Sequence, residues 1–125
     1  PPCRLWGKPA LVNLQRQSPR LARIALDQAE ACLQQHPRHW AWLFIGLMRA
    51  LWAAEDGEER NCRAWWAVAN ERGLGRMVSS DLRDPLERLS KATKRHGWND
   101  IADRAFQYQK AIEQAEAPTP PQPDI

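Results

Sequence analysis

The sequence predicts an all-α fold of five or six antiparallel helices, and three features support this. No segment alternates apolar and polar residues as a half-buried strand does. Proline, serine, asparagine, aspartate and glycine residues stand at intervals that fit the beginnings and ends of helices. Two stretches resemble each other at a spacing of 40 residues, with Ala50, Gly57, Cys62, Trp66 and Ala69 recurring in kind as Ser90, Gly97, Ala102, Phe106 and Gln109. We therefore expect either a stack of helical hairpins or an irregular helical bundle.

The chain of 125 residues has the length of one domain. Its hydrophobic fraction of 43% and charged fraction of 26% are those of a globular protein. We expect the helical domain at 18–117, between an N-terminal linker at 1–17 with room for a short helix and a proline-rich tail at 118–125. Seven tryptophans indicate a core with aromatic wedges, with either none or one or two left for binding.

The first two helices are predicted from their ends. Ser18 and Pro19 provide an N-cap and a first-turn proline for a helix near 19–35, which Pro37 ends. The next helix, at about 39–55, is apolar around its whole circumference and therefore belongs between neighbours. It ends at Asp56 and Gly57, where glycine can take the left-handed conformation.

Three further segments follow. A helix at 58–72 ends before Gly73, and the loop at 73–80 carries Leu74, Met77 and Val78, which we expect to pack against the body. Asp84, Pro85 and Glu87 predict a capping box for a helix that reaches His96. Asn99 is expected to cap the last helix, which continues toward Pro118. Its inner stripe is expected to hold Ile101, Ala105, Tyr108 and Ile112.

The segment at 58–73 resembles the second helix of tetratricopeptide-like repeats, especially the Sel-type variant, through the order of Cys62, Trp65, Trp66, Ala69 and Gly73. Gly57 and Gly97 match the turn glycine of that family, and Ala50 and Ser90 match its small residue in the first helix. The resemblance covers roughly 40–116 and implies stacked hairpins with aromatic wedges at Trp66 and Phe106. It also implies that the helix at 19–35 is the second half of an incomplete hairpin. Gly46, Arg49, Gln109 and the 40-residue period depart from the pattern.

No catalytic residue, metal site or cofactor is predicted. The sequence contains no GxSxG, phosphate loop, dinucleotide fingerprint or HExxH. Cys32, His36 and His39 are close in sequence, but Pro37 interrupts them and no fourth ligand is near. Cys62 is interpreted as a small packing residue. The acidic residues Glu55, Asp56, Glu58 and Glu59 are interpreted as a solvated turn.

The three cysteines form no close pair, so we expect reduced thiols and a cytoplasmic location. The longest apolar stretch, 40–54, is short for a membrane span and contains Arg49, so no membrane partner is expected. The start at Pro1 without a methionine suggests a segment of a larger protein, and no signal peptide is expected.

The leading functional hypothesis is a non-enzymatic helical-repeat interaction domain that binds a peptide or a partner protein. Helical stacks offer extended surfaces on which aromatic and arginine side chains supply the dominant contacts. The candidate residues for this surface are Trp42, Arg49, Arg63 and Trp65. Trp65 adjoins Trp66 on a helix, so the two rings diverge by about 100° and one of them must face elsewhere.

The alternative hypothesis is a helical module that binds nucleic acid through the basic segment at 72–95. Its candidate residues are Arg72, Arg76, Arg88, Lys91, Lys94 and Arg95. Trp98 or Trp40 could then stack on an unpaired base. A third hypothesis is an enzyme of a type without a recognised motif. The sequence predicts neither the identity of the partner nor the oligomeric state.

Overall fold

A computed structural model describes residues 18–36 and 41–116. In these ranges the chain forms five α-helices: α2 (Pro19–Leu33), α3 (Ala41–Glu55), α4 (Glu59–Glu71), α5 (Arg83–His96) and α6 (Asn99–Glu116). Two short 3-10 turns, Leu74–Arg76 and Ser80–Leu82, connect α4 to α5, and these ranges contain no strand. The all-α prediction is confirmed. The short helix expected before Ser18 lies outside the described residues.

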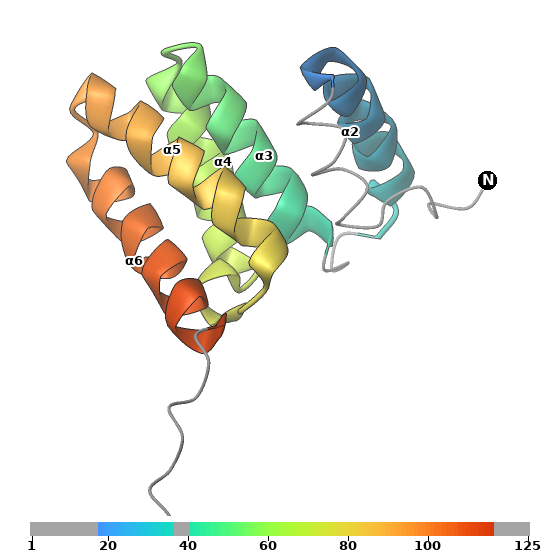
Figure 1. Cartoon of the computed structure of the whole chain (residues 1–125). Coiled ribbons are helices and arrows are strands. Elements are labelled where there is room, and N and C mark those ends of the chain that lie inside the picture. The colour runs from blue at the N-terminus through green and yellow to red at the C-terminus, as the bar shows by residue number, and fades with distance from the viewer. Residues whose placement is uncertain (1–17, 37–40, 117–125) are drawn as a thin grey trace, which may run out of the picture.

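Successive helices run antiparallel, so α3 and α5 point one way and α2, α4 and α6 the other (Figure 1). The α3–α4 hairpin and the α5–α6 hairpin stack side by side in the same orientation. His96 Nε2, at the end of α5, lies 2.8 Å from the carbonyl oxygen of Ala54, at the end of α3. The phenol of Tyr108 on α6 reaches Asn70 on α4. Each helix of one hairpin therefore lies beside its counterpart in the other.

Helix α3 lies at the centre of the core. Most of its side chains are buried, including Leu43, Leu47, Met48 and Leu51, each at most 1% exposed. α2 covers one side of α3, while α4 and α5 pack against others, so apolar residues are buried around its whole circumference. The prediction of a helix enclosed by neighbours is confirmed.

The backbones of α3 and α4 approach closely at Gly46. A Cβ atom at this position would lie 3.0 Å from both the amide nitrogen of Ala69 and the carbonyl oxygen of Trp65. Ala69, which lies at this contact, and Cys62, also on α4, are both fully buried. The absence of a large residue at Gly46 therefore sets the spacing of the first hairpin.

The two predicted turn glycines have left-handed backbones. Gly57 has a φ of 76° and Gly97 a φ of 80°. At the end of α5, the amide of Gly97 donates to the carbonyl of Lys94 and the amide of Trp98 donates to that of Thr93. These bonds satisfy carbonyls that the helix end would otherwise leave open, so the chain reverses directly into α6.

The predicted beginnings of the last two helices are shifted. The capping box at Asp84 is wrong, because the 3-10 turn leads without a break into α5 at Arg83 and no side chain caps the helix through Leu82. Asn99 is the first residue of α6 rather than its cap, since the carbonyl of Trp98 accepts the first helical hydrogen bond, from Ala102. In the connecting loop Leu74 is buried as expected, but Val78 is 58% exposed.

The predicted wedge at Phe106 is also wrong. Phe106 is 49% exposed, and the Nζ atom of Lys110 lies over its ring, 5.1 Å from the centroid. Residues 106 and 108 are about 200° apart on a helix. Since Tyr108 faces α4, Phe106 lies on the opposite flank of α6, where the structure describes no further hairpin. Trp66 meets Tyr108 of the neighbouring hairpin, with ring centroids 5.9 Å apart, and is half-buried.

The expectation of reduced thiols is wrong at Cys32, which is disulfide-bonded. Spacing along a chain does not reveal which cysteines approach each other in the fold. Cys62 is a free thiol and is fully buried. The cytoplasmic location stays a prediction, and it loses the support that the thiols were expected to give.

Candidate partner-binding groove

The four residues predicted to form one partner surface lie in three places. Trp42 stands near the start of α3 and donates its indole hydrogen to the carbonyl of His36 at 2.9 Å. Arg49 and Trp65 lie together between α2, α3 and α4, with the guanidinium carbon 5.6 Å from the ring centroid. Arg63 lies on the flank of α4 that faces α6, where it bonds Asp100. Of the four, Arg49 and Trp65 are the two that the structure brings into contact.

Arg49 connects α2 to α3. Its Nη2 donates to Asp27 at 2.6 Å and also to Glu30, both on α2. Its side chain is only 22% exposed, and its Nε is buried without an acceptor. Two carboxylates and the Trp65 ring surround this guanidinium, so its contacts are made within the protein.

A cavity of about 200 Å³ adjoins this cluster, lined by Arg23, Arg49, Trp52, Ala53, Asp56, Glu58, Asn61 and Trp65. Its charged groups are paired: Arg23 lies 3.6 Å from Asp56 and 5.0 Å from the Trp52 ring centroid. Asn61 donates to Glu58 at 2.8 Å. The cavity is small and polar, and its side chains bond one another across the junction of three helices.

A larger cavity of about 420 Å³ lies between α4 and α6, lined by Trp66, Ala67, Asn70, Asp100, Arg104 and Tyr108. We call it the α4–α6 groove. Trp65 and Trp66 therefore line different cavities on the two flanks of α4, which confirms the expected divergence of the two rings. The groove has the size of a site for a few side chains of a ligand.

The floor of the groove is held by a chain of hydrogen bonds. Tyr108 donates its phenol hydrogen to Asn70 Oδ1 at 2.6 Å, and Asn70 Nδ2 donates to the carbonyl of Trp66 at 2.8 Å. The Trp66 and Tyr108 rings are inclined by 31° to each other. Because Asn70 bonds both the Tyr108 phenol and the backbone of α4 at Trp66, the Tyr108 side chain is positioned against α4 before any ligand arrives.

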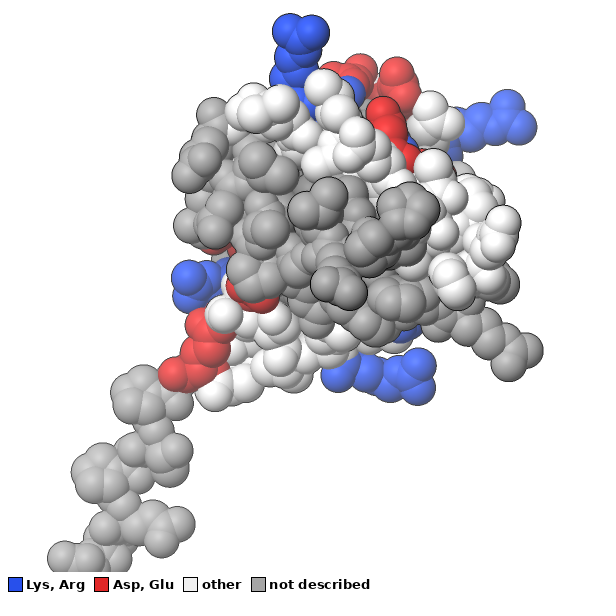
Figure 2. Space-filling model, turned by 90° about the vertical axis from the view of Figure 1, so that its right-hand side faces the viewer, with Lys and Arg blue, Asp and Glu red and all other residues white. Residues whose placement is uncertain are grey.

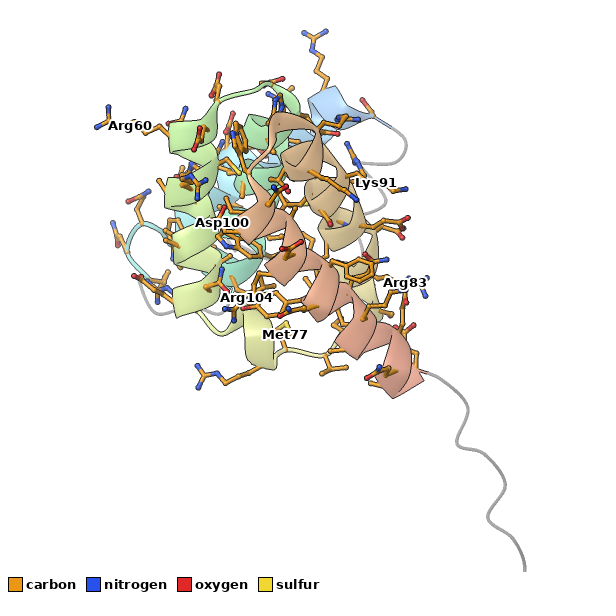
Figure 3. All side chains as sticks on the ribbon, turned by 90° about the vertical axis from the view of Figure 1, so that its left-hand side faces the viewer. Arg60, Met77, Arg83, Lys91, Asp100 and Arg104 are labelled. Atoms are coloured by element: carbon orange, nitrogen blue, oxygen red, sulfur yellow. The ribbon has the colours of Figure 1, made fainter. Side chains whose placement is uncertain are left out.

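Charge is distributed unevenly at the rim of the groove. Arg63 donates to both oxygens of Asp100, at 2.7 and 3.2 Å, and to Glu59 at 2.8 Å. The hydrogen bonds from Arg63 hold the pKa of Asp100 below its usual value, and the same bonds raise the pKa of Arg63. Arg104 is exposed and has no carboxylate partner among the described side chains. Figure 3 shows Arg104 on α6 beside α4, whereas Arg60 projects away from the molecule.

The basic residues at 72–95 do not form one continuous surface. Arg88 donates to both oxygens of Glu55, at 2.9 and 2.7 Å, and Lys91 donates to Glu87 at 3.0 Å. Lys94 and Arg95 lie at the far end of α5, without an ion pair to any described residue.

Arg72 and Arg76 lie at the opposite end of the bundle, because α4 ends where α5 begins (Figure 1). The two groups are separated by roughly 20 Å, the length of a helix of 14 residues. Where charged side chains are visible on the α2 side in Figure 2, basic and acidic groups are scattered around the margin rather than gathered by sign. Trp98 is half-buried and stacks on His96 at 4.6 Å, and Trp40 lies outside the described residues. The nucleic-acid surface stays a prediction.

The sequence pointed to other residues than those that line the groove. The sequence predicts a wedge at Trp66 and an inner stripe that includes Tyr108, and Arg104 belongs to no motif. A usable signal is the helical spacing of Asp100, Arg104 and Tyr108, which places three polar or aromatic residues on one face of α6. That spacing alone does not show that the face adjoins Trp66.

Burial raises the pKa of the Cys62 thiol to about 11, which keeps it protonated and unreactive near neutral pH. Among the described residues no three histidine, cysteine, aspartate or glutamate side chains are grouped so that they could hold a metal ion. Of the candidate set at 32–39, His39 lies outside those residues. No helix in the described ranges is both long enough and apolar enough to cross a membrane.

Comparison with known proteins gives no relative: no protein family, curated protein or solved structure matches the chain.

Proposed function

We propose that the chain is a non-enzymatic interaction domain of a larger protein, and that it binds a peptide or a segment of a partner protein in the α4–α6 groove. The observation that carries the proposal is the cavity of about 420 Å³ between the second helices of the two stacked hairpins, with Trp66 and Tyr108 on its floor. Large aromatic side chains in a preformed recess are typical of the centre of a binding surface.

Two further observations favour this groove over the cavity at the α2–α3–α4 junction. The smaller cavity is closed by ion pairs that hold α2 to the body, so a ligand there would compete with contacts of the fold. In the groove Arg104 is exposed, and Trp66 and Tyr108 are half-buried side chains of the lining. Its contacts among Asn70, Trp66 and Tyr108 stay in place while a ligand binds above them.

Ala67 provides a direct test. It is exposed and lines the groove, so Ala67→Arg fills the recess without entering the core. Ala64 is exposed on the same helix and does not line the groove, which makes Ala64→Arg the matched control. Arginine has a high helix propensity, and both variants are expected to unfold at temperatures close to that of the original chain.

The measurement is selection of peptides from a random phage-displayed library on each of the three proteins. We expect peptides that bind the original chain and Ala64→Arg alike, with binding lost on Ala67→Arg. Peptides that bind all three proteins equally well would exclude the groove as the binding site.

A further inference from the structure

Most polar groups in the α4–α6 groove already have partners. The side-chain oxygen of Asn70 accepts from Tyr108 and its nitrogen donates to the Trp66 carbonyl. The two oxygens of Asp100 accept from Arg63. A ligand would gain little by competing for these groups, because each new bond would replace an existing one.

Two side-chain groups of the groove have no partner among the described residues, and both are hydrogen-bond donors. No described residue accepts from the indole N–H of Trp66, and this nitrogen is not buried. The guanidinium of Arg104 is exposed and makes no ion pair with a described residue, because Asp100, one helical turn before it on the same face, is bonded to Arg63. An indole N–H and a guanidinium can only donate, so a complementary ligand must bring acceptors.

The other side chains that line the groove offer mainly carbon surface: the rings of Trp66 and Tyr108 and the methyl group of Ala67. A proline residue suits such a surface because its ring is apolar and its carbonyl accepts, while it has no N–H that would need an acceptor of its own. Proline-rich segments are also extended before they bind, so they lose little conformational entropy on aromatic surfaces. A carboxylate matches the planar donor array of Arg104.

From these features we infer that the α4–α6 groove binds an extended, proline-rich segment of a partner protein in which an acidic residue follows the prolines. The prolines lie on the Trp66 and Tyr108 rings, a carbonyl of the segment accepts from the indole N–H, and the carboxylate pairs with Arg104. This inference rests on the proposed function and specifies the chemistry of its ligand.

The first test measures binding of a labelled peptide, acetyl-Ala-Pro-Pro-Ala-Pro-Pro-Asp-Ala-amide, to the full chain by fluorescence polarisation. Arg104→Glu is compared with Arg60→Glu, since Arg60 is also exposed, carries no ion pair to a described residue and lies outside the groove. We expect Arg104→Glu to weaken binding by about tenfold and Arg60→Glu by no more than about twofold. A peptide with lysine in place of aspartate is expected to show the reverse preference, binding Arg104→Glu better than the original chain.

The second test follows the indole N–H of Trp66 by NMR, with its resonance identified by its loss in Trp66→Phe. We expect this resonance to shift as the peptide is added, and we expect a peptide with alanine in place of every proline to bind at least about fivefold more weakly. Equal losses for the Arg104 and Arg60 variants, or equal binding of the proline and alanine peptides, would overturn the inference.

These outcomes separate the inference from the function on which it rests. Library peptides that depend on Ala67 but lack both proline and acidic residues would leave the groove as the binding site and overturn only its assigned ligand. A further outcome is that the peptide binds only after residues 118–125 are removed. The groove would then be occupied by the prolines and Asp124 of this chain, and the inference of a partner protein as the ligand would be overturned.

Discussion

Gly46 is the residue that allows α3 and α4 to lie in close contact. An added methyl group would lie 3.0 Å from backbone atoms of Trp65 and Ala69, and backbone atoms cannot move aside as a flexible side chain can. Helix propensity alone favours alanine over glycine by about 1 kcal/mol. We expect the steric effect to prevail, so that Gly46→Ala lowers the free energy of unfolding by about 1–3 kcal/mol.

Urea denaturation checks the sign of this change. The control is Ala64→Gly, on the exposed face of α4, which measures the alanine–glycine difference in helix propensity without a packing contact. This substitution should lower the free energy of unfolding by about 1 kcal/mol. A Gly46→Ala protein that is more stable than the original chain would show that the two helices can separate without loss.

Trp66 and Phe106 occupy equivalent places in the sequence, but we expect unequal effects when they are truncated. Trp66 is half-buried against Tyr108, whereas Phe106 is 49% exposed with only Lys110 over its ring. Trp66→Ala should cost about 2–4 kcal/mol, because it removes a large ring from a packed contact. Phe106→Ala should cost less than about 1 kcal/mol. Equal urea midpoints for the two variants would contradict this ranking.

Cys62 makes the stability depend on pH at the alkaline end. Burial raises its pKa from 9.0 to about 11, so the folded state holds the proton more tightly than the unfolded state. The stabilisation is fully present below pH 9 and is lost as the pH rises toward 11, by roughly 2–3 kcal/mol. We expect the free energy of unfolding to fall less steeply between these pH values in Cys62→Ala. Parallel pH curves for the two proteins would exclude this contribution.

At the scale of the element, α2 depends on Arg49. This guanidinium bonds Asp27 and Glu30, in addition to the apolar stripe of α2 and the contacts of Arg23 with Trp52 and Asp56. In Arg49→Leu we expect amide hydrogens of α2 to exchange about tenfold faster, with little change in α5 and α6. Arg63→Leu is the control, since Arg63 also bonds two carboxylates but joins α4 to α6. Equal protection of α2 in both variants would mean that the other contacts of α2 hold this helix without Arg49.

The bounds of the helices could be predicted wherever local chemistry decides them. Ser18 caps α2 by accepting from Leu21, as its position before proline predicts, and Gly57 and Gly97 close α3 and α5 with left-handed backbones. The start of α5 could not be predicted in the same way. Ser79 accepts from the amide of Asp81 and caps a 3-10 turn that continues into the helix. The helix therefore begins before Asp84, despite the capping-box pattern at that residue.

The groove could be predicted less well than the bounds of the helices, because it depends on how α4 and α6 lie beside each other. The hydrogen bond between Tyr108 and Asn70 joins residues 38 positions apart, and nothing local to either segment specifies it. The sequence predicted that Trp65 and Trp66 face apart, since that follows from helical geometry alone. It could not predict which of the two rings would meet an aromatic partner on α6.

At the scale of the whole molecule, the two flanks of the described stack differ. Leu21 and Ile24 are exposed on α2, whereas the flank formed by α5 and α6 carries the pairs Lys91 with Glu87 and Lys110 with Glu113 beside Phe106. The exposed Phe106 therefore lies on a flank that carries ion pairs.

The distribution of charge over the whole molecule gives the last prediction, which concerns nucleic acid. Engagement of all six basic residues at 72–95 would give a slope of log affinity against log salt of about −5 for duplex DNA. Two of the six, Arg88 and Lys91, already pair with carboxylates, and the rest are divided between opposite ends of α5. We expect a slope no steeper than about −2, measured by fluorescence polarisation with a labelled duplex, and little change in Lys91→Glu/Arg95→Glu. A steep slope that this variant abolishes would favour nucleic acid over a peptide as the ligand.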